Sequence, residues 1–595
     1  MGMRLHGMRV AVTGGARGIR RATVAASAES GARVVIPTKR LVAMRNSFMA
    51  RNLDSLATGL GDAAETLRAV VRLHQRGVID LTRLDRVARM ARENRIYGPP
   101  AALIMAGARH HPHRPAIADE RGVLTYGELD EQSNALANAL LAQGLTAGSV
   151  VGVLARDHRG LVLAISAAGR AGLRLAMMNT GFAKPQFAEV AARENVRAML
   201  HDSEFDDLLD ALPPTLPRIL TWVDEGHAVP AGARTVDELI NGGDHRMPPA
   251  PARPGGFIIL TSGTTGLPKG APRTKVTPLA SAMIADRIPF PRKGCVVIVS
   301  PIFHSTGFGT WTVATALGNK TVLLRRFDAE ATLRAVREHR AEMLVAVPTM
   351  LHRLVALGPE IIGRYDLSSL KTIAVAGSAL SPELATRVQD TFGDVLYNLY
   401  GSTEVAVATV AQPHELRLAP GTVGRPPVTS KIALFDDEGR KVTARNVSGR
   451  VFVRSGAPFE GYTDGRHKQF IDGYMSTGDM GRIDDHGLLH IDGRDDDMIV
   501  SGGENVYPLE IENLLAARPD IDEVAVIGVA DDEFGKRLRA YIVPAPGATV
   551  SAPEIQAYVK RNLARYKVPR DVVVMDELPR NATGKVLRRV LQEMN

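Results

Sequence analysis

Two patterns of apolar residues alternate along most of the chain: short continuous runs, and longer segments with helical periodicity. Residues 150–154 and 257–260 are short, continuous apolar runs, which are typical of strands buried on both faces. Residues 161–171 have a helical pattern, and residues 195–200 form a further strand that we expect to end before His201. This alternation predicts an α/β fold in which helices cover mainly parallel sheets.

The C-terminal part has a different pattern. Strands are expected at residues 524–529, 539–543 and 572–574, with one helix that is opened by Ser551. A glutamate three residues after this serine completes a capping box. These few elements predict a small α+β unit over residues 493–595, behind a larger α/β domain.

The first forty residues carry a separate signal. A strand over residues 9–12 is followed by the glycine-containing stretch 13–20, a helical Ala/Ser segment and a second strand over residues 32–36. This order resembles the opening βαβ unit of short-chain dehydrogenases. However, Arg20 stands where that family has its third glycine, and its Tyr-x-x-x-Lys motif occurs nowhere in the chain. We therefore expect residues 1–40 to be a remnant that binds no nicotinamide cofactor.

Residues 41–98 form a basic extension with helical periodicity. From about Asp54 to Arg95, apolar positions recur on one face of two helices that Gly77 separates, and arginines lie off that face. Such helices can lie on a membrane surface or pack on the domain that follows, and we favour packing. Gly98 and the two prolines after it mark the expected domain boundary.

Composition narrows the class of protein. A chain of 595 residues with 45% apolar and 23% charged residues is expected to be soluble and multidomain, and no apolar run is long enough to span a bilayer. Its one cysteine, Cys295, excludes an internal disulfide and a cysteine-rich metal cluster, and we expect it to be buried and inert. The net charge of +9 suits a polyphosphate ligand or an anionic membrane surface, but no basic block of the nucleic-acid-binding kind is present. We expect a cytoplasmic protein that is able to associate with a membrane.

The strongest chemical motif directly follows the strand at residues 257–260. It runs from Thr261 to Gly270 and contains three glycines, four hydroxyl side chains and Lys269. Glycines let backbone amides approach an anion, hydroxyls donate further hydrogen bonds, and the lysine adds a positive charge. The spacing differs from G-x-x-x-x-G-K-[ST], because a glycine follows the lysine. We interpret the motif as a different nucleotide-phosphate loop, with a polar surface linker as the alternative.

Other polar groups follow strand-like runs further along the chain. His304 follows a strand at residues 296–300, and Gly377 follows a strand at residues 372–376. Open α/β sheets bind ligands at the carboxyl ends of their strands, so these groups are candidates for a site. Taken alone, each also has an ordinary structural explanation as a turn residue or a solvated charge. The remaining candidates of this kind are Ser378, Ala379, the run from Tyr400 to Glu404, Asp479, the run from Gly493 to Asn505, and Lys585.

Five of these motifs, taken in order, carry a family resemblance: the phosphate loop, the Tyr400 turn, the Asp479 turn, residues 493–505 and the Lys585 loop. From about Ala101 onward the chain resembles the adenylate-forming, or AMP-binding, superfamily, and within it the bacterial fatty-acyl-CoA synthetases. The resemblance implies a large domain, a small mobile domain and a site between them. The expected divisions are residues 1–40, 41–98, 99–492 and 493–595.

The resemblance also assigns roles to residues. Lys585, Thr403 and His304 would act at the reacting groups, and Glu404 with Thr261 would bind magnesium. The small domain would rotate about Asp496 between two half-reactions. The nucleotide and coenzyme A would be bound by Thr261, Ser262, Gly263, Thr264, Thr265, Gly266, Lys269, Gly377, Ser378, Ala379, Tyr400, Gly401, Asp479, Arg494, Gly502 and Gly503.

The implied reaction uses ATP, magnesium and coenzyme A. A fatty acid would attack the α-phosphate to give an acyl-adenylate, which the coenzyme A thiol would convert to acyl-CoA and AMP. Magnesium and Lys585 would neutralise the charge that grows in the transition state. One alternative is an acyl-AMP ligase that delivers to a carrier protein, and another is a non-catalytic lipid- or nucleotide-binding protein. Neither acyl chain length nor oligomeric state can be inferred from the sequence.

Overall fold

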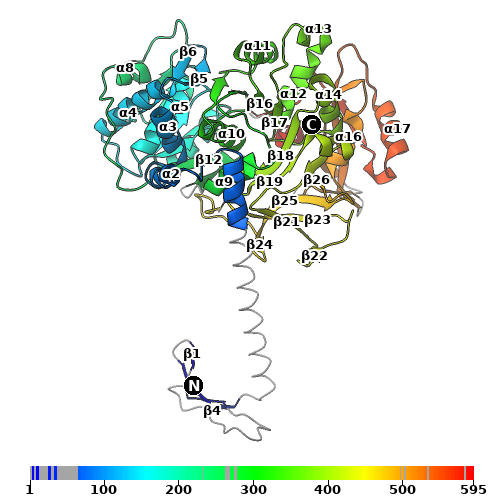
Figure 1. Ribbon diagram of the computed structural model, residues 1–595. Coiled ribbons are helices and arrows are strands. Elements are labelled where there is room, and N and C mark those ends of the chain that lie inside the picture. The colour runs from blue at the N-terminus through cyan, green and yellow to red at the C-terminus, as the bar shows by residue number, and fades with distance from the viewer. Residues whose placement is uncertain are drawn as a thin grey trace. The chain divides into compact units, whose positions relative to one another are not determined.

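The computed structural model describes most of the chain (Figure 1). It separates into two units, Met1–Arg68 and Ala69–Asn595, which we describe individually. The described residues are 3–5, 8–12, 24–27, 33–35, 65–230, 232–261, 268–273, 278–457, 459–495, 497–501, 504–531, 535–581 and 584–594.

The first unit contains a four-stranded sheet in which successive strands are antiparallel. The helical Ala/Ser segment expected here is wrong over Val24–Ser27, because these residues form a strand that pairs with both of its neighbours. A parallel βαβ pair needs helices over its faces, whereas antiparallel strands need only short connections. The likeness to short-chain dehydrogenases is not confirmed. The strands are β1 (Met3–Leu5), β2 (Met8–Val12), β3 (Val24–Ser27) and β4 (Arg33–Val35).

The second unit contains two large sheets, and the first has the strand order β11-β10-β9-β7-β8-β12-β13. All of its pairs are parallel except the edge hairpin of β12 and β13, which flanks the phosphate loop. The strand expected to end before His201 continues to Asp202. The strands are β7 (Val150–Leu154), β8 (Arg174–Met177), β9 (Val196–Asp202), β10 (Arg218–Trp222), β11 (Arg234–Thr235), β12 (Gly256–Thr261) and β13 (Lys269–Arg273).

The second large sheet has the order β19-β18-β17-β16-β14-β15-β5-β6. Its six central strands are parallel, and antiparallel hairpins close both edges. The predicted α/β class is therefore confirmed. The strands are β5 (Pro115–Asp119), β6 (Gly122–Thr125), β14 (Cys295–Ile298), β15 (Lys320–Leu323), β16 (Met343–Ala346), β17 (Thr372–Val375), β18 (Leu396–Ser402) and β19 (Ala406–Ala411).

A third sheet is antiparallel and precedes the small C-terminal domain, whose main sheet has the order β29-β30-β31. The third sheet contributes Asp479 and Arg494 to the candidate site described below, and the C-terminal domain contributes the Lys585 loop. The third sheet contains β20 (Thr422–Gly424), β21 (Ser430–Phe435), β22 (Lys441–Val442), β23 (Gly449–Ser455), β24 (Phe470–Ile471), β25 (Tyr474–Ile483) and β26 (Leu489–Arg494). The C-terminal strands are β27 (Ile499–Ser501), β28 (Glu504–Val506), β29 (Ile521–Asp531), β30 (Gly535–Pro544) and β31 (Asp571–Val574).

Helices cover the sheets, and the predicted start of one of them is confirmed, because Ser551 forms a capping box with Glu554 at α17. Two other helices, α11 and α14, are capped by Asp328 and Ser381. The helices are α2 (Leu84–Tyr97), α3 (Pro99–His110), α4 (Tyr126–Ala142), α5 (Arg159–Arg170), α6 (Lys184–Arg193), η1 (Ser203–Phe205), α7 (Asp206–Leu209), α8 (Val236–Asn241), α9 (Pro278–Ala285), α10 (Ser305–Ala316), α11 (Ala329–His339), α12 (Pro348–Ala356), α13 (Gly358–Ile362), α14 (Pro382–Phe392), α15 (Pro413–Leu418), α16 (Pro508–Ala516), α17 (Ala552–Asn562), η2 (Arg565–Lys567) and α18 (Arg588–Glu593).

The main apolar core joins the two large sheets. α3 packs against α4, α5 and α10, and α5 is buried along almost its whole length. One continuous apolar cluster includes side chains of both sheets and of the helix α5 between them. Examples are Val153 of the first sheet, Ile165 of α5 and Ile298 of the second sheet. Cys295 is buried as expected, and burial raises the pKa of its thiol to about 11. None of the helices in the described residues is long and apolar enough to cross a bilayer.

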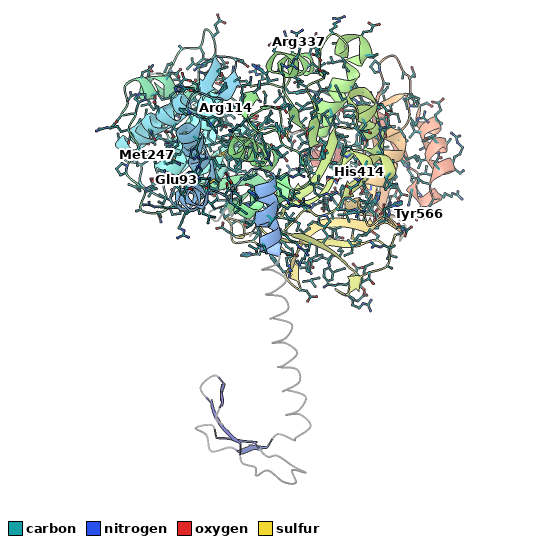
Figure 2. All side chains as sticks on the ribbon, viewed as in Figure 1. Glu93, Arg114, Met247, Arg337, His414 and Tyr566 are labelled. Carbon is teal, nitrogen blue, oxygen red and sulfur yellow. The ribbon has the colours of Figure 1, made fainter. Side chains whose placement is uncertain are left out.

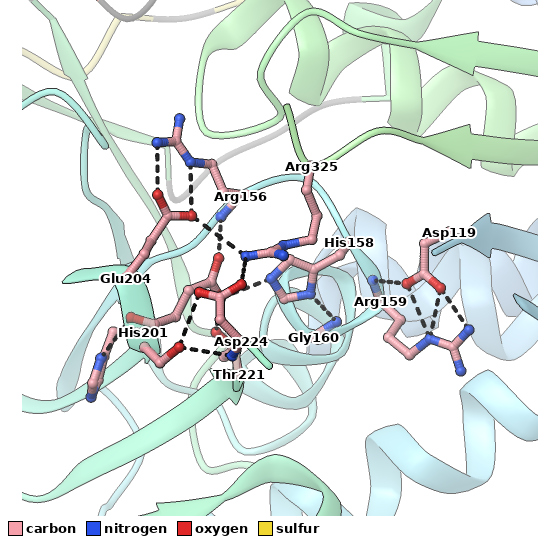
Figure 3. A network of polar contacts seen from close by, with 12 residues as sticks. Asp119, Arg156, His158, Arg159, Gly160, His201, Glu204, Thr221, Asp224 and Arg325 are labelled. Carbon is pink, nitrogen blue, oxygen red and sulfur yellow. Dashed lines mark hydrogen bonds and ion pairs between the residues drawn. The ribbon is translucent and has the colours of Figure 1, made fainter. Parts of the chain in front are cut away.

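A buried polar network holds together the carboxyl ends of neighbouring parallel strands (Figure 3). The Asp202 carboxylate at the end of β9 accepts hydrogen bonds from the Arg156 backbone amide at 2.8 Å, from Thr221 at 2.6 Å and from His158 Nε2 at 2.8 Å. Burial alone would raise the pKa of Asp202, but His158 and these hydrogen bonds keep it below its ordinary value. The network therefore fixes the loop after β7. Asp157 in this loop accepts a hydrogen bond from the Ile302 backbone amide at 2.9 Å, which connects the loop to the second sheet.

We predict that Asp202→Ala destabilises this part of the protein by about 3 kcal/mol, because it leaves several buried donors without an acceptor. Urea unfolding followed by tryptophan fluorescence would measure the loss, since Trp222 lies beside His158. Asp436→Ala is the matched control, because the carboxylate it removes interacts at the surface with Arg440, through an ion pair and a hydrogen bond from the backbone amide, and the loss should cost less than about 1 kcal/mol. Equal costs for the two variants would contradict this role of Asp202.

Candidate active site

The phosphate-loop motif lies between β12 and β13, at the edge of the first sheet. Thr261 lies at the end of β12, and its backbone is described but its side chain is not. Five further residues of the motif lie outside the described residues: Ser262, Gly263, Thr264, Thr265 and Gly266.

Lys269 opens β13, and its Nζ atom lies 5.2 Å from the centroid of the Tyr462 ring. Burial lowers the pKa of Lys269, and Arg466 and Lys468 lower it further. The ammonium group therefore faces other cations, which favours an anion beside it.

The Tyr400 turn connects β18 and β19 of the second sheet. A Cβ atom on Gly401 would lie 1.9 Å from the Ala406 carbonyl oxygen, so the hairpin requires glycine at this position. The Arg273 guanidinium donates to the carbonyl oxygens of Thr403 and Glu404. This arginine ties the turn to the strand that leaves the phosphate loop.

Glu404 is buried, and its carboxylate accepts a hydrogen bond from the Tyr462 hydroxyl. Burial alone would raise the pKa of Glu404, but Tyr462, Ser402 and Lys468 together keep it below its ordinary value. The side chain is thus an anion at neutral pH, which suits a hard cation such as magnesium.

No group of three or more His, Cys, Asp or Glu that could hold a metal by itself occurs in the described residues. Magnesium bound to a nucleotide takes only one or two protein carboxylates and completes its shell with phosphate and water oxygens. A single ionised Glu404 beside Lys269 therefore fits a magnesium–nucleotide complex.

Asp479 and Arg494 face each other across β25 and β26, where they are paired in register. Arg494 Nη1 lies 3.2 Å from one carboxylate oxygen of Asp479, and the Tyr400 hydroxyl donates to the other. Burial and the neighbouring Asp479 raise the pKa of Tyr400, so its hydroxyl stays protonated and donates. The structure thus joins three predicted site residues from two different sheets.

Lys585 lies in a tight loop before α18, where its backbone amide donates to Asn581 Oδ1 at 2.9 Å. Desolvation and the nearby Arg494 lower the pKa of Lys585, while Asp497 and Asp479 act in the opposite direction. Lys585, from the C-terminal domain, therefore lies close enough to the Asp479–Arg494 pair for both charges to affect it.

His304 and Gly377 lie at the carboxyl ends of two parallel strands of the second sheet. His304 precedes α10, and its Nε2 atom is buried without a hydrogen-bond partner in the described part of the chain. Burial lowers its pKa to about 4, so the ring is neutral at pH 7. Gly377 has a φ of 102°, a left-handed value that favours glycine, and Ser378 and Ala379 follow it.

Besides the five residues of the phosphate loop named above, three further predicted residues cannot be placed, because Asp496, Gly502 and Gly503 lie outside the described residues. Conversely, sequence reasoning missed Tyr462 and Arg273, which contact predicted site residues. Neither residue belongs to a recognised motif. Each reaches the site only because segments that are distant in the sequence meet in the fold.

Sequence reasoning also missed a cavity of about 270 Å³ beside the Lys585 loop, whose wall includes Gly584 and Thr349. Asp157 is also on the wall, and burial raises its pKa to about 7. Glu204, Asp224 and Glu523 offset part of the positive charge through ion pairs with four of the arginines of the wall. The wall nevertheless carries five arginines from separate segments: Arg156, Arg325, Arg326, Arg353 and Arg580.

The sequence matches the AMP-binding enzyme family over residues 105–463 and the AMP-binding enzyme C-terminal domain over residues 510–585. The indoleacetate–CoA ligase of Aromatoleum aromaticum is 32% identical over 495 residues, which cover 81% of this chain and 95% of that relative. A fatty acid–acyl-carrier-protein ligase, ScoC of Streptomyces coeruleorubidus, is 28% identical over 500 residues, which cover 82% and 94%.

Among solved structures, the o-succinylbenzoate CoA synthetase MenE of Bacillus subtilis, in complex with its acyl-adenylate intermediate, is 26% identical with a TM-score of 0.71. The match covers 82% of this chain and 97% of that one. The two family matches cover most of the large domain and of the C-terminal domain, and they include the phosphate loop, the Tyr400 turn and Lys585, whereas Asp479 and Arg494 lie between the two matched ranges. The chain therefore belongs to the AMP-binding enzyme family.

Proposed function

We propose that this protein joins a fatty acid to the thiol of coenzyme A, with ATP and magnesium, and releases AMP and pyrophosphate. Family membership supports the coarser assignment, an AMP-forming acid–thiol ligase. The observation that carries the proposal is that Lys585 lies near the Asp479–Arg494 pair, because a cation of the C-terminal domain is then close to a carboxylate suited to ribose hydroxyls.

The proposed roles follow from the charges of the reactants. A carboxylate that attacks a phosphate brings two anions together, so Lys585 would stabilise the charge that develops between them. Magnesium, when bound at Glu404, would neutralise charge on the phosphates. Lys269 and the phosphate loop would hold the β- and γ-phosphates, and Asp479 the ribose.

The acid and the acceptor are the finer parts of the proposal. The relatives act on different acids, and one of them is a fatty-acid ligase. That relative also favours the carrier-protein alternative, as its name states this acceptor. We prefer coenzyme A, because five arginines around the cavity beside Lys585 suit its three phosphates better than the single phosphate of a carrier's pantetheine arm.

We also propose that the domains divide at residues 98 and 492, and that the small domain turns about Asp496 between the two steps. One orientation would bring Lys585 to the α-phosphate. The other would bring Gly502 and Gly503 to the thiol, where the absence of side chains leaves room.

Peripheral membrane contact is a further part of the proposal, and α2 is the surface we assign to it. Leu84 on α2 is 68% exposed, and four exposed arginines of the helix form no ion pair within the described part of the chain. Like charges three residues apart destabilise a helix, so this face suits an anionic partner. Glu93 marks α2 in Figure 2, on the opposite side of the second unit from Tyr566 of the C-terminal domain. The arginines are Arg86, Arg89, Arg92 and Arg95.

We predict that Lys585→Ala lowers fatty-acid-dependent exchange of pyrophosphate into ATP by about 100-fold or more, because the transition state loses its mobile cation. The same variant should convert supplied acyl-adenylate to thioester at nearly the wild-type rate. Single-turnover kinetics of each half-reaction would measure both steps. Lys560→Ala, an exposed lysine of the same domain, is the control. Equal losses in both steps would show that one fixed site serves both.

For the arginine-lined cavity, we predict that Arg353→Gln raises the KM for coenzyme A about fivefold, corresponding to about 1 kcal/mol for one exposed charge-assisted contact. The KM values for ATP and for the acid should not change. Removal of the 3′-phosphate from coenzyme A should have an effect of similar size. An unchanged KM, together with faster transfer to a carrier protein, would favour the alternative acceptor.

For α2, we predict that the full chain sediments with vesicles of phosphatidylglycerol and phosphatidylcholine but not with pure phosphatidylcholine. Binding should fall by roughly three orders of magnitude when all four α2 arginines become glutamine, since each contributes about 1 kcal/mol near a charged surface. The charge-matched control replaces four exposed arginines elsewhere, and its binding should stay near that of the wild type. Equal binding by both quadruple variants would exclude α2 as the contact. The control residues are Arg197, Arg234, Arg334 and Arg364.

A further inference from the structure

Tyr462 lies between the lysine of the phosphate loop and the carboxylate that suits magnesium. Its hydroxyl donates to Glu404 Oε1, and its ring centroid is 5.2 Å from Lys269 Nζ. The residue is only 8% exposed, so both contacts form in a largely dry environment. One side chain therefore touches two charged groups of opposite sign that come from different sheets.

The segment that carries Tyr462 is fastened to the phosphate-loop hairpin. The Thr463 amide donates to the Gly270 carbonyl oxygen at 2.9 Å, and the Thr463 hydroxyl donates to Glu194 Oε1 at 2.8 Å. A Cβ atom on Gly270 would lie 2.5 Å from the Thr463 hydroxyl, so the close approach depends on this glycine. The Phe459 ring packs edge-on against Tyr462 at 5.0 Å. These contacts hold the phenol in one place relative to β13.

The contacts give the phenol one role, that of a donor. The Tyr462 hydroxyl donates to Glu404 Oε1, so the carboxylate is the acceptor of this buried hydrogen bond. The same ring presents its negative face to the Lys269 ammonium, which already lies among the cations Arg466 and Lys468.

A purely structural explanation is that Tyr462 fills space and satisfies its own hydroxyl. That explanation accounts for the buried ring, but phenylalanine would fill the same space without a buried hydroxyl to satisfy. It gives no reason why the two polar contacts are made to Glu404 and Lys269, two predicted site residues. Both contacts fall on groups that would meet the same bound polyphosphate.

We propose that Tyr462 is a positioning residue for magnesium–nucleotide binding: its hydroxyl orients the Glu404 carboxylate toward the metal, and its ring holds Lys269 within reach of the phosphates. The inference rests on the proposed function, because it needs a magnesium–nucleotide complex at this site. Neither contact requires Tyr462 to touch the reacting atoms. The hydroxyl and the ring make separable contributions, which two substitutions can distinguish.

The test is calorimetric binding of a non-hydrolysable ATP analogue to the full chain, over a series of magnesium concentrations. Tyr462→Phe keeps the ring and removes the hydroxyl, so half-saturation should need about tenfold more magnesium, with near-normal affinity once magnesium saturates. Tyr462→Leu removes both contacts and should also weaken nucleotide binding at saturating magnesium, by about threefold. Circular dichroism and thermal melting of each variant would establish that it is folded.

Tyr365→Phe is a matched control, because the Tyr365 hydroxyl also donates to a glutamate, Glu330, at 2.6 Å and its ring also lies beneath a cation, Arg337. Its magnesium requirement should equal that of the wild type. A Tyr462→Phe variant with the wild-type requirement, or with no larger shift than Tyr365→Phe, would overturn the inference. Failure of the wild type to bind the analogue at any magnesium concentration would instead overturn the proposed function.

Discussion

The ion pair of Asp479 and Arg494 is the interaction on which the candidate site depends. It forms because β25 and β26 pair with these two residues in register, so the antiparallel sheet alone sets their separation. Tyr400 reaches the same carboxylate from the parallel sheet, and Lys585 approaches it from the C-terminal domain. One short contact across two strands therefore links three parts of the chain that are far apart in sequence.

Charge balance is the second constraint on this region. The proposed reactants are all anions, so the protein must supply cations and still keep its own carboxylates ionised. Glu404 illustrates the solution, since hydrogen bonds and a lysine hold its pKa low although burial acts against this. His304 shows the opposite case, because its buried ring has no cationic form at neutral pH. The predicted site thus has charged groups where phosphate is expected, whereas the ring of His304 is neutral.

Local pattern was sufficient to predict some strands of the two large sheets, among them those at residues 150–154 and 372–376. The run at residues 150–154 coincides with β7, and Ser551 opens α17, because burial on two faces and helix capping are both determined by adjacent residues. The helix expected at Val24–Ser27 is wrong. This segment is compatible with both helix and strand, and it forms a strand that pairs with β2 and β4.

The candidate site was only partly predictable for a related reason. Lys269, Asp479 and Lys585 stand in recognisable motifs, whereas Tyr462 and Arg353 do not. Tyr462 matters through contacts with residues 58 positions or more away, as for its hydrogen bond to Glu404. Arg353 is one of five cavity arginines that come together only when separate segments meet. Such convergence depends on the folded topology, and a single sequence carries no local signal for it.

The proposed function requires that an acyl-adenylate forms, and oxygen-18 labelling can detect this step. The protein would be incubated with ATP, magnesium, coenzyme A and a fatty acid labelled with oxygen-18 in both carboxyl oxygens, and the products analysed by mass spectrometry. Attack of the carboxylate on the α-phosphate leaves one labelled oxygen on AMP after thioester formation, and the account predicts this result. Label in inorganic phosphate, or unlabelled AMP accompanied by thioester, would contradict it.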